Sequence, residues 1–192
     1  MIRIDSNYNP FSFRDEVDRL SGQKVENCIA CGKCSSGCVI APFMDLFPHE
    51  VMKLISMGRE KEVLSSKTIW LCVSCEACTT RCPEGIDIAR VMDTLRKIAL
   101  EKGYTPSEKD IYNFNKAFLN TIEKFGRIFE LGFIMDFYRR GFSLFRNIKD
   151  NIDLGLGMLN RGKLPFKPHS VSDKVSIKRC FEKAKRFIEE GG

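Results

Sequence analysis

One cysteine spacing occurs twice, and this repeat constrains the fold more than any other feature of the sequence. Eight of the nine cysteines form two C-x2-C-x2-C-x3-C runs that lie 44 residues apart: Cys28, Cys31, Cys34, Cys38, Cys72, Cys75, Cys78 and Cys82. Two runs of four thiols suit two cubane clusters, because each iron of a cubane takes one thiolate. The chain is therefore predicted to hold two [4Fe-4S] clusters that carry electrons and bind no substrate.

The ends of the two runs indicate how the ligands are shared. Pro83 follows the second run and completes a signature of two-cluster ferredoxins, in which the fourth cysteine of each run ligates the other cluster. Val39 stands at the equivalent place after the first run, which affects the local turn but removes no ligand. The predicted ligands are Cys28, Cys31, Cys34 and Cys82 for cluster 1, and Cys72, Cys75, Cys78 and Cys38 for cluster 2.

Other residues near the runs have simpler interpretations. Structural zinc sites usually pair two C-x2-C units across a loop, so the continuous runs argue against zinc. Cys180 falls in a helical apolar pattern and is predicted to be a buried thiol rather than a ligand. Trp70 either shields a cluster from water or packs in the core. His49, beside Pro48 at a predicted helix start, is expected to be a surface or capping residue.

The segments around the cysteines have the apolar spacing of helices. Helices are predicted from Pro10 to Gly22, over 48–57 with Gly58 at its end, and over 60–64. The clearest helix has Asp87 as its cap and ends at 102–103. The fold class is therefore all-α, with the cluster loops between helices.

The second half of the chain has a different composition. It contains 11 of the 15 phenylalanines, and its 17 basic and 11 acidic residues account for the whole net charge of +6. Ser107 is expected to cap a helix, and a phenylalanine recurs at every fourth position from Phe125 to Phe137. A turn-rich connection is predicted over 150–171 and a last helix over 172–190. The pattern indicates either a helical core or a surface that docks a partner.

Residues 22–103 resemble the α-helical ferredoxin domain in the iron-sulfur subunits of succinate dehydrogenase and fumarate reductase. A closer resemblance is to the family of the small iron-sulfur subunit, the C subunit, of soluble CoB-CoM heterodisulfide reductases of methanogens. It is carried by NCIACGKCSSGC, PFMDLFPHEVMKLISMG, IWLCVSCEACTTRCPEGIDI and NRGKLPFKPH. The chain is thus expected to comprise an α-helical ferredoxin domain with an N-terminal helix (1–103) and a Phe-rich helical extension for subunit docking (104–192).

The resemblance also implies a function. The chain would relay single electrons between two other subunits of a heterodisulfide reductase. The donor would be the flavin-containing, iron-sulfur A subunit, and the acceptor would be the cysteine-rich, catalytic B subunit, which reduces the CoM-S-S-CoB disulfide in methanogenesis. A larger complex with a hydrogenase or formate dehydrogenase would supply the electrons. The sequence has no glycine-rich nucleotide loop, flavin fingerprint or hydrolytic triad, so no catalytic residue is expected in this chain.

Three other functions fit the cysteines, and one of them is a non-enzymatic metal-stabilised scaffold, whose clusters would have to be redox-silent. Iron-sulfur subunits of glycolate or anaerobic glycerol-3-phosphate oxidation share the runs, but usually continue into a further cysteine-rich domain. A free ferredoxin-like carrier is expected to be shorter and acidic. The basic residues are scattered among acidic ones, which argues against nucleic acid as a partner. With no apolar run of about 18 residues and no secretory pattern at its start, the chain is expected to be cytoplasmic and without a membrane span.

Overall fold

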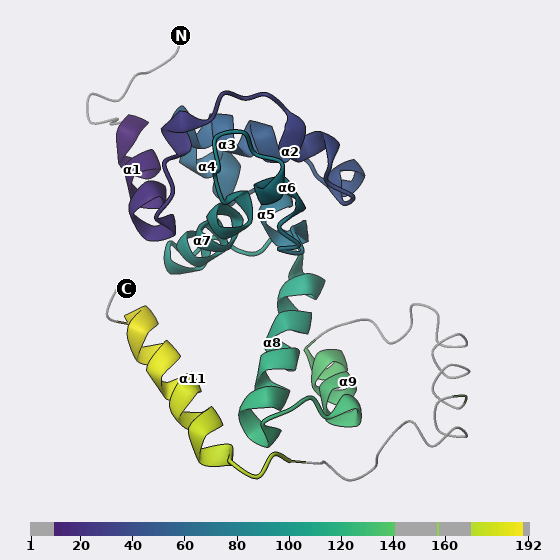
Figure 1. Cartoon of the computed structure of the whole chain (residues 1–192). Coiled ribbons are helices and arrows are strands. Elements are labelled where there is room, and N and C mark those ends of the chain that lie inside the picture. The colour runs from purple at the N-terminus through teal and green to yellow at the C-terminus, as the bar shows by residue number, and fades with distance from the viewer. Residues whose placement is uncertain (1–9, 141–156, 158–169, 190–192) are drawn as a thin grey trace. The chain divides into compact units, whose positions relative to one another are not determined.

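The computed structural model describes residues 10–140, 157 and 170–189, and every regular element in these ranges is a helix (Figure 1). This confirms the predicted all-α class. The chain divides into two compact units, Met1–Lys109 and Asp110–Gly192, which are called the cluster unit and the C-terminal unit below. No helix within the described ranges combines the length and the apolar character needed to cross a membrane.

The cluster unit contains two kinds of helix, longer ones that form its core and very short ones that lie within the cysteine runs. In chain order its elements are α1 (Pro10–Ser21), η1 (Val25–Asn27), α2 (Lys33–Ser36), η2 (Ala41–Phe43), α3 (Pro48–Ser56), α4 (Glu60–Leu64), α5 (Thr68–Leu71), α6 (Ala77–Thr80) and α7 (Ile88–Glu101). The predicted helices that start at Pro10, Pro48, Glu60 and Ile88 are all present. The four-residue helices α2 and α6 are too short to be stable alone, so the longer helices must hold them.

The core of the cluster unit lies between α1, α3 and α7. Helix α7 contacts α1, α4, α5 and α6, while α1 also contacts α3. The side chains that face this core are fully buried, among them Val17 on α1, Val51 and Ile55 on α3, and Leu95 and Ile98 on α7. Each such burial contributes about 1.5–3 kcal/mol, and the apolar stripes therefore fix the frame that carries the cysteine loops.

Two aspartates join segments that lie far apart in the sequence. Asp87 caps α7 by accepting the Arg90 N–H (3.0 Å), and its own N–H donates to the side chain of Gln23 (2.9 Å). Asp45 lies between the two cysteine runs and accepts from the backbone N–H groups of Lys67 (2.9 Å) and Thr68 (3.1 Å). Asp45 thereby holds the start of α5, the short helix that leads into the second run.

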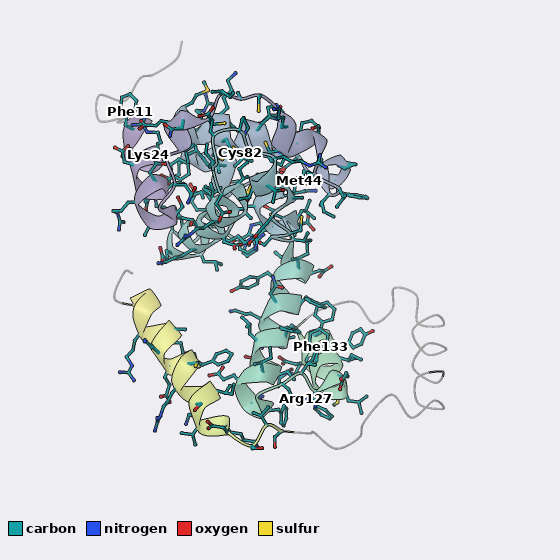
Figure 2. The ribbon with its side chains drawn as sticks, viewed as in Figure 1. Phe11, Lys24, Met44, Cys82, Arg127 and Phe133 are labelled. Atoms are coloured by element: carbon teal, nitrogen blue, oxygen red, sulfur yellow. The ribbon has the colours of Figure 1, made fainter. Side chains whose placement is uncertain are left out.

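The C-terminal unit contains α8 (Lys109–Phe125), α9 (Glu130–Arg139) and α11 (Lys174–Glu189). Helices α8 and α9 lie side by side, and Figure 2 shows Phe133 on α9 between them. The ring of Phe133 meets Phe114 of α8 edge-on at 5.0 Å between centroids, and Phe118 at 6.3 Å. The phenylalanine repeat therefore runs across two helices, because Gly126 ends α8 with a positive φ of 76°.

Two expectations for the second half of the chain are wrong. Ser107 does not cap α8, because the helix begins two residues later at Lys109, and the Ser107 hydroxyl donates to the Ser65 carbonyl (2.7 Å). Cys180 is exposed rather than buried, since the apolar face of α11 is covered only partly, at Ile177 and Phe181. The last helix begins within two residues of its predicted start. The turn-rich connection predicted over 150–171 lies mostly outside the described residues.

Candidate cluster-binding site

The cysteines of the two runs line two pockets of the cluster unit, four in each. The first pocket is lined by Cys28, Cys31, Cys34 and Cys82, and the second by Cys38, Cys72, Cys75 and Cys78. The pockets enclose about 340 Å³ and 450 Å³, including the open space at their mouths. Each pocket thus combines three cysteines of one run with the fourth cysteine of the other run, and Figure 2 labels Cys82.

The first turns of α3 and α7 form equivalent walls of the two pockets. His49 and Met52, the second and fifth residues of α3, line the first pocket, while Ala89 and Met92, the second and fifth residues of α7, line the second. Ile88 lines both pockets and is only 3% exposed. The partial positive charge at each helix N-terminus favours an anionic group, such as a thiolate-ligated cluster.

The loops between the cysteines have the same unusual backbone in both runs. Ala30 (φ 52°) and Gly32 (φ 76°) in the first run correspond to Ser74 (φ 49°) and Glu76 (φ 60°) in the second. Such left-handed residues turn successive N–H groups into a concavity that binds anions, a device found at iron-sulfur sites. A non-glycine residue in this conformation costs about 1–3 kcal/mol, so it persists only where the surroundings require it.

The short helices α2 and α6 contact each other where the two runs cross. Gly37 precedes Cys38 and Arg81 precedes Cys82, so these two residues occupy equivalent positions of the repeat. A Cβ atom on Gly37 would overlap the Arg81 guanidinium, which means that the glycine makes room for the arginine. The two fourth cysteines are thereby held in neighbouring segments.

A network on α7 fixes the start of the second run. The Arg96 guanidinium donates to the backbone carbonyls of Ile69 and Cys72, and to the Asp93 carboxylate at 2.9 Å. Asp93 also accepts from the Ser74 hydroxyl (3.0 Å). The loop between the first two cysteines of this run is therefore attached to the helix that lines its pocket.

Burial shifts the acidity of three of the thiols. It raises the pKa of Cys34, Cys72 and Cys78 above the usual value for cysteine. For Cys72 the raising effect of burial exceeds the opposing effects of the Ser74 N–H and the Arg96 charge. Because iron binds the thiolate, cluster binding must release these protons.

The donor set fits two cubanes. Each pocket offers four soft thiol donors around a space between helices, which supplies one ligand to every iron of a cubane. Among the described residues, no three histidine, cysteine, aspartate or glutamate side chains are grouped closely enough for a single metal ion.

Two residues noted from the sequence lie near the pockets in different ways. Trp70 is 5% exposed and is not among the residues that line either pocket, so it packs in the core. His49 is half-buried and lines the first pocket, where both its N–H and its ring contact Ser35. The sequence showed only that His49 begins a helix, because the approach of that helix to Ser35 depends on the tertiary fold.

A helical unit with two four-cysteine pockets defines an iron-sulfur electron-transfer protein of the dicluster type. Residues 24–86 match the 4Fe-4S dicluster domain family, and this domain implies two [4Fe-4S] clusters. The chain is also similar to C subunits of heterodisulfide reductases, over about half of its length.

Curated relatives match about half of this chain. The C subunit of the H(2):CoB-CoM heterodisulfide,ferredoxin reductase of Methanothermobacter marburgensis is 26% identical over 103 residues, or 53% of this chain and 56% of that protein. The C subunit of the ferredoxin:CoB-CoM heterodisulfide reductase of Methanosarcina acetivorans is 33% identical over 79 residues, or 41% of this chain and 32% of that protein. Its counterpart in Methanosarcina mazei is 32% identical over 93 residues, or 48% of this chain and 57% of that protein. The chain therefore spans between about a third and just over half of these relatives.

Proposed function

We propose that this chain is the electron-transfer subunit of a cytoplasmic heterodisulfide reductase complex. It would relay single electrons from a flavin-containing partner to a cysteine-rich catalytic partner that reduces the CoM-S-S-CoB disulfide. The observation that carries the proposal is the pair of four-cysteine pockets that share Ile88 as a wall. When bound, the clusters supply one-electron transfer, which suits a relay between a two-electron flavin and a disulfide.

We propose crossed ligation for the two clusters. Cys28, Cys31, Cys34 and Cys82 would hold cluster 1, and Cys72, Cys75, Cys78 and Cys38 would hold cluster 2. The grouping of the same cysteines in the first and second pockets supports this assignment. Zinc fits the sequence less well, because structural zinc sites usually pair two C-x2-C units across a loop rather than use continuous runs of four cysteines.

The residues between the pockets would keep water away from the electron path. Ile88, Met52 and Met92 line the pockets and are at most 3% exposed. An apolar shell around a cluster limits solvent access and so influences its reduction potential. These side chains have no redox chemistry of their own, and their role is to separate and shield the two sites.

The C-terminal unit is the proposed docking element. Several of its large apolar side chains remain exposed, including Phe114 (44%), Leu119 (51%) and Met135 (73%). Aromatic residues and arginine are enriched at protein interfaces, and this half of the chain contains both. The relative from Methanothermobacter marburgensis is named for H(2) as well as the heterodisulfide, which supports a complex that includes a hydrogenase. A formate dehydrogenase is the alternative electron source.

Purification of the tagged protein from its own cells under anaerobic conditions tests the proposal. We expect two further subunits, one with flavin and one rich in cysteine, to co-purify in fixed ratio, and the complex to reduce CoM-S-S-CoB. A protein that carries two clusters but purifies alone, and that exchanges electrons with several enzymes, would instead be a free carrier. Co-purification with a glycolate or glycerol-3-phosphate dehydrogenase would support the other iron-sulfur family.

A further inference from the structure

A hydroxyl residue follows the third cysteine of each run, but the two hydroxyls have opposite partners. These residues are Ser35 after Cys34 and Thr79 after Cys78. Each hydroxyl contacts a residue at the start of the next long helix, α3 after the first run and α7 after the second. We propose that this difference makes the cluster of the first pocket easier to reduce than the cluster of the second, so that electrons pass from the second pocket to the first. The inference rests on the proposed binding of two cross-ligated clusters.

In the first run the hydroxyl is free to donate to the cysteine. The Ser35 oxygen lies 2.7 Å from Nδ1 of His49, accepts the His49 backbone N–H at 3.1 Å, and is 3.9 Å from the Cys34 sulfur. A cysteine that ligates iron is a thiolate without a proton, so Ser35 must be the donor in the contact with Cys34. The His49 ring then donates from Nδ1 to Ser35. The three groups form a hydrogen-bond chain that ends on a cluster ligand.

In the second run the Thr79 hydroxyl donates its proton to a carboxylate instead of to the cysteine. Thr79 donates to Oδ1 of Asp87 at 3.0 Å. The hydroxyl also contacts Cys78, but an ionised carboxylate can only accept hydrogen bonds and accepts them strongly, so the single threonine proton goes to Asp87 rather than to Cys78. Asp87 is fixed in this position because it also caps α7 through the Arg90 N–H (3.0 Å). The second pocket therefore has a nearby negative charge in place of a donor.

Both differences act on reduction in the same direction. Reduction adds one negative charge to a cluster, and hydrogen bonds to the sulfurs together with nearby charges set the potential. The His49 chain stabilises the reduced form in the first pocket, whereas Asp87 opposes it in the second. When an electron moves between the pockets, the second-pocket cluster loses one electron and the first-pocket cluster gains it, so no other reactant is needed.

Other charges also lie near the pockets. Glu84 lines the first pocket, but it is exposed and water screens its charge. Arg96 lies beside the second run, where it favours a negative charge at Cys72, and Asp93, paired with it at 2.9 Å, opposes that effect in part. The proposed order therefore requires the hydroxyl partners to outweigh the remaining effect of Arg96.

Redox titration of the anaerobic full-length protein, followed by electron paramagnetic resonance, tests the inference. The unmodified protein should show two one-electron steps at different potentials. His49→Ala should lower only the higher potential, and His49→Asn, which keeps a donor near the Nδ1 position, should lower it less. Asp87→Asn, which retains a good helix cap, should raise only the lower potential. Glu101→Gln at the far end of α7 is the control and should change neither step.

The outcomes separate this inference from the proposed function. Two clusters that titrate at one potential, or a His49→Ala variant that lowers the lower step, would overturn the inference and leave the electron-transfer role intact. A protein that binds no pair of clusters would overturn both. Iron and sulfide analysis of each variant, together with its circular dichroism, distinguishes a shifted potential from a lost cluster.

Discussion

At the scale of single residues, Asp45 shows how a side chain outside the cysteine runs supports them. Burial opposes ionisation of Asp45, but donation from the Lys67 and Thr68 backbones and the Thr68 hydroxyl outweighs it, so its pKa is below the usual value. A lowered pKa means that the folded state favours the carboxylate. The resulting stability is complete above about pH 4, the ordinary carboxyl value, and is lost as the pH falls through the lower folded-state pKa.

Replacement of Asp45 should therefore weaken the attachment of the second run. Asp45→Asn keeps one acceptor oxygen and loses the charge, so we expect a loss of about 1 kcal/mol. The measurement is the rate of cluster loss in urea at neutral pH, which should rise about fivefold. Asp15→Asn is the matched control, because Asp15 is an exposed residue whose ion pair with Arg14 contributes little. Equal rates for the two variants would contradict the role given to Asp45.

At the scale of elements, the sequence predicted the long helices better than the short ones. The apolar period places α3 and α7 within a residue or two of their observed bounds, because each buries one face over several turns. Helices α2 and α6 are four residues long and have no readable period. The left-handed backbone at Ser74 and Glu76 was equally hidden, since only Gly32 in the other run has a residue type that favours it.

Gly126 is the residue that separates α8 from α9, and its substitution tests that connection. Gly126→Ala would place a side chain at a φ of 76° and against Val171, so we expect a loss of about 1–2 kcal/mol or more from the C-terminal unit. Hydrogen exchange should become faster over 110–140 and 170–189 while both clusters remain.

Gly103→Ala isolates the backbone effect in this comparison. Gly103 has the same φ of 76°, but no atom lies within 4 Å of the added Cβ. Its substitution should therefore cost less than that of Gly126. If Gly126→Ala left exchange in the C-terminal unit unchanged, the proposed conflict with Val171 would be wrong.

At the scale of the whole molecule, cluster binding would make the charges of the two halves opposite. Residues 1–103 have 14 charges of each sign, and two oxidised four-thiolate cubanes would add about −4. The remaining residues keep their +6. In the proposed complex, such an asymmetry would orient the encounter with a partner, while exposed apolar side chains would supply contact area.

A chain that ends at Lys109, the last residue of the cluster unit, tests this division of roles. It retains all eight ligands and the whole of α7, so we expect both clusters and their spectra to persist. Association with the catalytic partner and reduction of the disulfide should be lost. Stoichiometric co-purification of the shortened chain would contradict the docking role, and loss of its clusters would show that the C-terminal unit is needed for the cluster fold.

The composition of the site was only partly readable from the sequence. The spacing alone pointed to the eight thiols, because thiolate donors at these intervals have few other uses. The apolar wall at Ile88, Met52 and Met92 could not be distinguished from an ordinary helix core. The pairing of Ser35 with His49 and of Thr79 with Asp87 depends on how α3 and α7 pack against the cysteine loops.

Crossed ligation is the central claim, and replacement of the fourth cysteines tests it most directly. The unmodified anaerobic protein should contain about eight irons and eight sulfides. In electron paramagnetic resonance spectra of the reduced protein, Cys38→Ser should alter the same signal as Cys72→Ser, while Cys82→Ser should alter the same signal as Cys28→Ser. A Cys38→Ser variant that alters the Cys28 signal instead would contradict the assignment of the pockets, and stoichiometric zinc with little sulfide would contradict the cluster assignment itself.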